Sequence, residues 1–276
     1  MNNKAYEYAK KSIKSKDVPK YVKKQCKEFI KIADGKSDKY YLDEDKIKQI
    51  ENVLKLLVMP KGLKAGKTLY ECTCNYQWLF YISVLAIVYK DNKNKRRYET
   101  AILEISRKNF KTYTIATLFI LLFLLEPKFS KFYSVAPDGS LSREVKTAIE
   151  ETLKSSPLIY LHKEEPRFKI LRDYITFKLK DSRYYPLNYS SSRMDGKLPN
   201  VFLADEVGAL PNPYAIEAMR SGQLNILNKL GCIISTKYPT FNNPFEDEVG
   251  YAKRVLDGIE KDETVFNDTK VVSLLL

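Results

Sequence analysis

Cysteine and histidine are scarce in this sequence, which has four cysteines and a single histidine, His162, among 276 residues. Structural zinc sites need four such ligands, and paired cysteines in them are usually separated by two to four residues. Only one residue separates Cys72 from Cys74, so this pair has the wrong spacing for a zinc knuckle. We therefore interpret all four cysteines, including Cys26 and Cys232, as reduced thiols of a cytoplasmic protein.

Apolar runs long enough to cross a membrane are also missing. As a helix, the run from Tyr113 to Leu125 would span roughly 20 Å, whereas a bilayer core is about 30 Å thick. The run from Trp78 to Tyr89 is too short as well. The lysine-rich N-terminus does not resemble a signal peptide. We expect both runs to be buried core, and no membrane partner.

Glycine is missing where a nucleotide-binding loop would need it. The phosphate-loop signature is G-x-x-x-x-G-K-[ST], placed between a buried strand and a helix. KGLKAGKT, at residues 61–68, comes close, but three residues instead of four separate Gly62 from Gly66. It also follows Met59-Pro60 and precedes LYECTC, which has no helical period. We interpret it as a flexible basic connection.

ISRKNFKT, at residues 105–112, departs from the phosphate-loop signature but lies in the sequence context that such a loop requires. The preceding YETAILEI is rich in apolar and β-branched residues, which is typical of a core strand. The run that follows, to Leu125, is apolar on every face and predicts a fully buried helix. A strand, a tight basic turn and a buried helix form the arrangement that a phosphate loop requires. Lys111 and Thr112 would then occupy the positions of the lysine that reaches the phosphates and the hydroxyl that holds Mg²⁺.

The charge is strongly positive, at a formal +13. Residues 1–31 hold ten lysines against Glu7, Asp17 and Glu28, so 10 minus 3 gives +7 there. A second basic cluster, KDNKNKRR, occupies residues 90–97. A solvated surface explains either cluster alone, whereas two clusters that flank a nucleotide site favour DNA or RNA as a partner.

Strands and helices alternate along the chain, which predicts an α/β sheet covered on both faces. The expected strands are 98–105, 131–137, 174–180, 201–206 and 231–239. The expected helices are one around residues 22–30, then 43–57, 112–125, 143–153 and 213–222, and a last one that begins at Asn243-Pro244. Residues 62–74 are expected to be irregular.

Two acids follow one of these strands, in NVFLADEVGAL. Asp205 and Glu206 should lie at the carboxyl end of a central strand, where α/β sheets place ligands. We expect Asp205 to hold Mg²⁺ through its water shell and Glu206 to orient and polarise the attacking water. The alternative, two solvated acids after an edge strand, is disfavoured by their position between the Lys111-Thr112 turn and a buried strand ending in Ser235-Thr236.

This order of motifs resembles the N-terminal ATPase domain of the large terminases of tailed phages. The similarity covers roughly residues 20–265 and rests on Gln77-Trp78, SRKNFKT, VFLADEVGAL, IISTKYP and NNPFEDEVGYAKRVLDG. It implies a P-loop NTPase fold with an additional strand between the Lys-Thr loop and the acidic strand. Members of that family often open the loop with Arg instead of Gly, and Arg107 fits.

The resemblance also implies roles for residues. Gln77 would read the adenine, and Ser235-Thr236 would form the motif that couples hydrolysis to DNA movement. Phe110 stands where a Gly normally precedes the lysine, but Asn109 tolerates left-handed geometry better than most residues, which would let the loop turn. The loop residues expected to bind nucleotide are Arg107, Lys108, Asn109, Phe110, Lys111 and Thr112, with Thr112 and Asp205 as the Mg²⁺ ligands.

Arg143 opens a predicted helix and is expected to complete the site of an adjacent subunit, because motor rings of this kind resemble assemblies that supply an arginine in trans. Arg107 is the rival, acting within one chain. In the structural alternative, Arg143 simply pairs with Glu144 or Glu150.

By this resemblance, the chain would be an ATP- and Mg²⁺-dependent motor that translocates double-stranded DNA into a procapsid in the host-cell cytoplasm. Its partners would be DNA, the small terminase subunit, the portal, and further copies in a homo-oligomeric ring. We expect a helical, basic region (1–70), an ATPase core (71–241), and a linker helix with a truncated C-terminus (242–276) that lacks the nuclease domain. The alternatives are a catalytically silent DNA- or partner-binding module and a small-molecule kinase.

Overall fold

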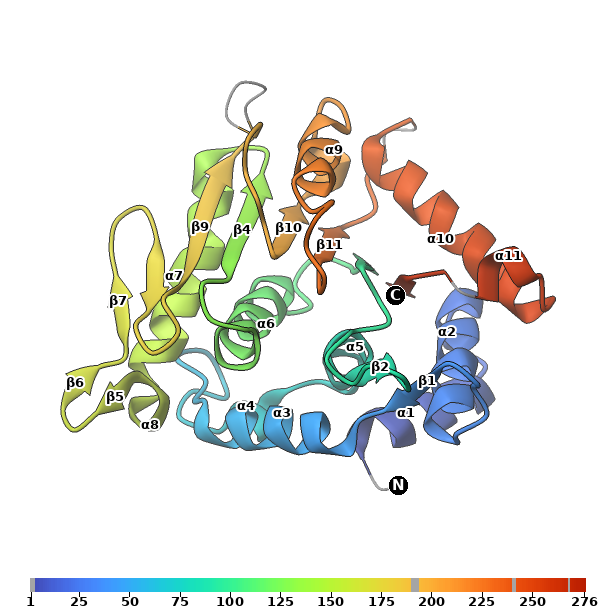
Figure 1. Ribbon diagram of the computed structural model, residues 1–276, viewed down its shortest axis with the longest axis horizontal. Helices are drawn as coiled ribbons and strands as arrows, with labels where there is room; N and C mark the ends of the chain where they lie inside the picture. The colour runs from blue at the N-terminus through green and yellow to red at the C-terminus, as the bar shows by residue number, and fades with distance from the viewer. Residues whose placement is uncertain (1–2, 190–193, 240–241, 268) are drawn as a thin grey trace.

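The computed structural model describes residues 3–189, 194–239, 242–267 and 269–276. Its centre is a sheet with six parallel strands and an antiparallel hairpin at one edge (Figure 1). In spatial order the strands are β12 (Val271–Leu275), β3 (Thr100–Glu104), β11 (Leu230–Ser235), β10 (Val201–Asp205), β4 (Lys131–Ala136), β9 (Ser182–Asn188), β8 (Ile175–Phe177) and β7 (Phe168–Ile170).

Helices cover both faces of the sheet, because successive strand residues point to opposite sides. On β10, Leu203 packs in one hydrophobic cluster, whereas Phe202 and Ala204 pack in another. The first cluster joins the sheet to α1 (Lys4–Lys14), α2 (Lys20–Ala33), α3 (Glu44–Leu56), α5 (Asn75–Ala86), α6 (Lys111–Leu125) and α7 (Gly139–Lys154). The second joins it to η1 (Val207–Ala209), α9 (Tyr214–Ser221) and α10 (Pro244–Glu260).

Short elements complete the chain. They are β1 (Tyr40–Leu42) paired with β2 (Ile87–Tyr89), β5 (Leu161–His162) paired with β6 (Glu165–Pro166), and the helices α4 (Leu69–Cys72), α8 (Pro157–Tyr160) and α11 (Thr264–Asn267).

Helix α6 is buried on all sides, as its composition predicts. Every residue from Thr114 to Phe123 is buried, because α6 packs under the sheet and against α7. None of the described helices is long and apolar enough to span a membrane.

The sheet order places β11 between β3 and β10, which confirms the additional strand of the predicted fold. Its register sets the carboxyl ends of the three strands side by side, with Ser235 opposite Glu104 and Asp205 opposite Ile234. The turn after β3, the acids after β10 and the segment after β11 therefore meet at one edge of the sheet.

Two expectations about local structure were wrong. Residues 62–74 are not irregular throughout, because Thr68 caps the short helix α4 in a capping box with Glu71. The C-terminal residues do not merely trail the linker helix, because Val271–Leu275 pair in parallel with β3 as strand β12. The division into three regions stays a prediction, and its boundary at residue 241 lies outside the described residues.

Candidate active site

The carboxyl edge of the sheet holds a cavity of about 630 Å³, called here the central cavity. Its walls come from the turn after β3, the start of α6, the first turns of α7, the end of β10 and the segment after β11. The predicted residues that line it are Arg107, Lys108, Phe110, Lys111, Thr112, Asp205, Glu206 and Thr236. The fold thus brings together residues that are up to 129 positions apart (236 minus 107).

The turn between β3 and α6 is held in an unusual backbone conformation. Lys108 and Phe110 adopt positive φ values of 67° and 60°, whereas Asn109, the residue expected to do so, does not. Phe110, which replaces the usual glycine, thus takes the left-handed conformation itself, at a cost of about 1–2 kcal/mol. The Tyr76 hydroxyl on α5 donates to the Asn109 carbonyl at 2.6 Å and fixes the turn from outside.

Lys111, the first residue of α6, crosses the cavity to both acids. Its Nζ lies 3.0 Å from Asp205 Oδ1 and also pairs with Glu206 Oε1. Burial alone would lower the pKa of Lys111, but the two carboxylates outweigh burial and raise the pKa above its usual value. The lysine is therefore held as a cation at the centre of the site.

Tyr238 is a site residue that sequence reasoning missed. Its hydroxyl donates to Glu206 Oε2 at 3.0 Å, and its ring lines the central cavity. The residue lies within the quoted IISTKYP, but no spacing rule distinguishes this tyrosine from the other nineteen of the twenty in the sequence.

Ser235 and Thr236 differ in their surroundings, although both are buried. Ser235 Oγ accepts a hydrogen bond from the Gly208 backbone N–H at 3.1 Å, which ties β11 to η1. Thr236 lines the central cavity, and its Oγ1 has no hydrogen-bond partner among the described residues. A buried hydroxyl without a partner costs free energy.

Gln77 lies outside the central cavity and lines a second, mostly apolar pocket of about 280 Å³. Its Nε2 donates to Thr114 Oγ1 at 2.6 Å, and its Oε1 accepts from the Cys74 backbone N–H at 2.7 Å. Phe110 and Tyr113 line both spaces, so the pocket adjoins the central cavity.

The KGLKAGKT stretch contributes to this apolar pocket without forming a phosphate loop. Residues 61–64 line the pocket, whereas Lys67 and Thr68 do not line the central cavity. Lys111 and Thr112, by contrast, line the central cavity.

Arg143 lies on the first turns of α7 and is exposed. It does not line the central cavity, but it lines an adjoining hollow together with Thr112 and Tyr113. Glu144, which was considered only as an ion-pair partner of Arg143, lines the central cavity.

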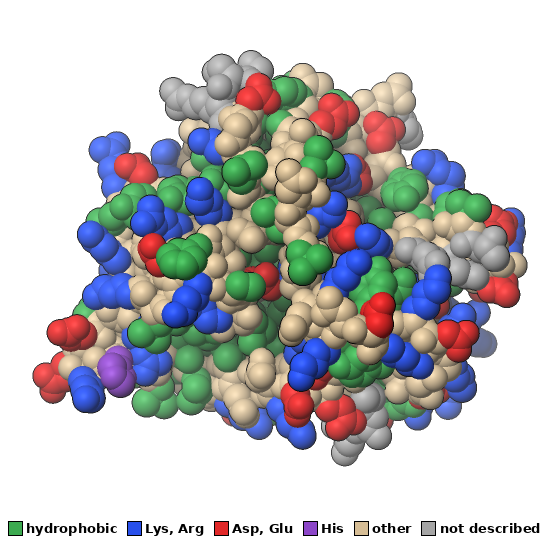
Figure 2. All heavy atoms as spheres, viewed as in Figure 1, with side chains coloured by type: hydrophobic (Ala, Val, Ile, Leu, Met, Phe, Trp, Pro, Cys, Tyr) green, Lys and Arg blue, Asp and Glu red, His purple; other side chains and the backbone are tan. Residues whose placement is uncertain are grey.

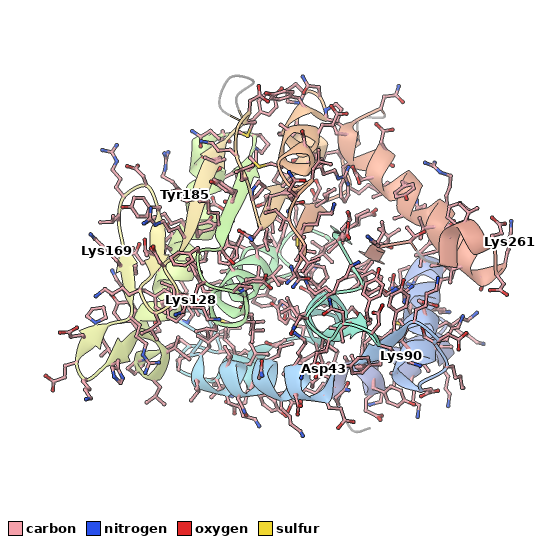
Figure 3. All side chains as sticks on the ribbon, viewed as in Figure 1. Asp43, Lys90, Lys128, Lys169, Tyr185 and Lys261 are labelled. Atoms are coloured by element: carbon pink, nitrogen blue, oxygen red, sulfur yellow. The ribbon has the colours of Figure 1, made fainter. Side chains whose placement is uncertain are left out.

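The basic cluster at residues 90–97 is only partly a surface feature. Arg96 and Arg97 are buried and pair with Glu126 and Glu28, the second pair at 2.7 Å. Figure 2 shows Lys and Arg side chains spread over the visible face. Figure 3 places Lys90 near β2, far from Lys169 on the hairpin side. On this face the exposed positive charge is therefore distributed and not gathered in one patch.

The fold and this site together define a P-loop NTPase of the additional-strand type. Residues 79–254 match the family described as "Terminase large subunit, ATPase domain". This match covers more than half of the 276 residues, so the chain belongs to that family. Gln77 lies just before the matched range.

A solved structure supports the fold. The large terminase of bacteriophage HK97 has a TM-score of 0.62 at 18% identity, over 82% of this chain and 43% of that one. The ADP complex of a large terminase from a thermophilic bacteriophage has a TM-score of 0.45 at 19% identity, over 64% and 40%. The ATPase domain of the Thermus phage P74-26 large terminase has a TM-score of 0.42 at 13% identity, over 54% of this chain and 63% of that one. This chain spans less than half of the HK97 protein's length, and no curated protein matches the sequence.

Proposed function

We propose that this chain hydrolyses ATP and uses the energy to translocate double-stranded DNA, as the motor part of a phage large terminase. One observation carries the proposal: Lys111 begins the buried helix after β3 and contacts both Asp205 and Glu206 across the additional strand. Membership of the terminase ATPase family supports the same reaction.

Each central residue has a role that its chemistry suits. Lys111 would exchange its carboxylate partners for the terminal phosphates of ATP, and Glu206 would accept a proton from the attacking water. Asp205 and Thr112 line one cavity and offer oxygen atoms, which Mg²⁺ prefers as ligands. Bound there, Mg²⁺ would neutralise developing charge on the phosphates.

The apolar pocket suits the adenine. Its volume of about 280 Å³ and its lining by Phe110, Tyr113 and Gln77 fit a flat aromatic ring with one polar edge. A nucleotide that lies across Phe110 and Tyr113 would place the base in this pocket and the phosphates beside Lys111.

DNA contacts are proposed to involve the phosphate backbone, because packaging cannot depend on sequence. The net charge of +13 supports this partner. By family likeness, we also propose that the chain binds a small terminase subunit and a portal. It would assemble into a homo-oligomeric ring and act in the host-cell cytoplasm. DNA cleavage forms no part of it.

The decisive test compares Lys111→Ala with Lys67→Ala. We expect the Lys111 variant to lose ATP turnover measured by phosphate release, with and without DNA, and to fall to background. The Lys67 variant should keep the wild-type rate, because Lys67 is exposed and does not line the central cavity. Wild-type turnover in Lys111→Ala, or loss of turnover in Lys67→Ala, would refute the site.

A second candidate is a silent DNA- or partner-binding module. The left-handed conformation of Phe110, a residue with a Cβ, favours it, because a glycine would form the same turn without strain. Salt-dependent DNA binding with no binding of a fluorescent ATP analogue, and no turnover by the wild-type chain, would identify this case.

A further inference from the structure

Tyr238 belongs to the segment that follows β11 but contacts the acid that follows β10. Its hydroxyl donates to Glu206 Oε2 at 3.0 Å. The other carboxylate oxygen, Oε1, pairs with Lys111. The two oxygens of Glu206 are thus held from opposite sides, one by the phosphate loop and one by the β11 segment.

The ring of Tyr238 packs closely against the backbone of Gly208. A Cβ built on Gly208 would lie 2.4 Å from Cδ2 of Tyr238, so no larger residue fits at this position without a shift of the ring. The Gly208 backbone N–H also donates to Ser235 Oγ. Because Gly208 is only two residues after Glu206, this packing ties the tyrosine to the short η1 turn that carries the acid.

The Tyr238 hydroxyl remains a hydrogen-bond donor at neutral pH. Burial raises the pKa of Tyr238, nearby Glu206 raises it further, and Arg107 opposes both. The phenol therefore keeps its proton. Glu206 itself has a left-handed backbone, with φ of 50° and ψ of 44°, and such a residue needs surrounding contacts to hold its conformation.

We propose that Tyr238 is a positioning residue that fixes the Glu206 carboxylate for hydrolysis and links it to the segment after β11. This proposal rests on the proposed function. When Lys111 turns to the phosphates, Oε1 of Glu206 is released while Tyr238 still holds Oε2. Water then gives a proton to Oε1 as its oxygen bonds to the γ-phosphorus and the bond to ADP breaks.

Tyr238→Phe removes the hydroxyl and keeps the ring on Gly208. We expect kcat for ATP hydrolysis to fall about 10- to 100-fold, the effect of losing one hydrogen bond to a charged group. KM and the affinity for a fluorescent ATP analogue should change less than about twofold, because only the orientation of Glu206 changes. The matched control is Tyr251→Phe, an exposed tyrosine on α10, which should keep wild-type kinetics.

Gly208→Ala tests the same contact from the other side, because the added Cβ pushes the ring away while the hydroxyl is retained. It should lower kcat to a similar extent. If both changes act through one hydrogen bond, the double variant should be within about twofold of the worse single variant. Multiplicative losses would mean that Gly208 does not act through Tyr238.

The two hypotheses fail differently. Wild-type kcat in Tyr238→Phe, beside an inactive Glu206→Gln, would overturn the role of Tyr238 and leave the proposed function intact. Equal changes in affinity and kcat would make Tyr238 a nucleotide-binding residue and also overturn its positioning role. Wild-type turnover in Glu206→Gln, or none in the unaltered chain, would overturn the proposed function itself.

Discussion

Lys111 Nζ lies 3.0 Å from Asp205 Oδ1, and this contact joins the first residue of α6 to the last residue of β10. The two residues are 94 positions apart (205 minus 111). Lys111 follows β3, and Asp205 ends β10, which is not a neighbour of β3 in the sheet. Their approach depends on β11, which separates β3 from β10 and sets the width of the site. The additional strand therefore helps to set the geometry of the candidate site.

The two acids should respond differently to loss of charge. Glu206→Gln keeps the shape of the side chain but cannot accept a proton, so turnover should fall about 10²-fold or more while ATP binding persists. Asp205→Asn should instead weaken the Mg²⁺-dependent part of nucleotide binding. Titration of a fluorescent ATP analogue with and without Mg²⁺ separates these effects, and equal binding defects in both variants would contradict the division of roles.

Thr236→Val should make the protein more stable but slow its ATP turnover. The Thr236 hydroxyl is buried and has no partner among the described residues, so replacing it with a methyl group should raise the free energy of unfolding by about 1 kcal/mol. Turnover should fall if the hydroxyl contacts the nucleotide or the attacking water. Thermal unfolding and phosphate release measure the two effects.

The matched control for this variant is Thr152→Val on α7. Thr152 is equally buried, but its hydroxyl donates to the Ala148 carbonyl at 2.7 Å. Its loss should destabilise the protein by about 1 kcal/mol and leave turnover unchanged. If Thr236→Val were also destabilised and kept wild-type turnover, the Thr236 hydroxyl would not be a ligand contact.

Local sequence patterns predicted the parts of the site that local chemistry determines. The apolar run to Leu125 identified α6 to within one residue, and the strand–turn–helix context selected Lys111 over Lys67. Asp205 and Glu206 followed from an apolar strand that ends in acids. Each of these signals lies within one continuous stretch of the sequence.

Contacts between distant segments were not predictable in the same way. Burial of Arg96 and Arg97 depends on Glu126 and Glu28, which no spacing rule connects to them. Strand β12 needs the edge of β3 to pair with, and five mostly apolar residues alone do not reveal that edge. The place of Tyr238 in the site depends on its packing against Gly208, which comes from a different segment.

Phe110 offers a test of backbone strain in the phosphate loop. Because its φ is 60°, Phe110→Gly should be more stable than Phe110→Ala by about 1 kcal/mol, the reverse of the usual order. At Asn109, which does not adopt a positive φ, the glycine variant should be the less stable one. Thermal unfolding of the four variants gives the comparison, and the same order at both positions would contradict the conformation of the loop.

Mixing variant chains tests whether Arg143 acts in the site of its own chain or in the site of a neighbouring chain. It makes no ion pair with any described residue, and it lines a hollow beside Thr112 and Tyr113 of its own chain. This position favours action within the chain, in contrast to the expectation of a contact in trans. Arg143→Ala should then lower turnover about 10³-fold, as loss of an arginine that stabilises the transition state does.

The discriminating experiment combines Arg143→Ala chains with Glu206→Gln chains. Each variant is expected to be inactive alone. An arginine that serves its own chain leaves every site in the mixed assembly defective, because each chain lacks either the arginine or the acid. We therefore expect no recovery of phosphate release in assemblies shown by mass to contain both chains. Recovery would place Arg143 across the subunit boundary, and full activity of Arg143→Ala alone would exclude it from catalysis.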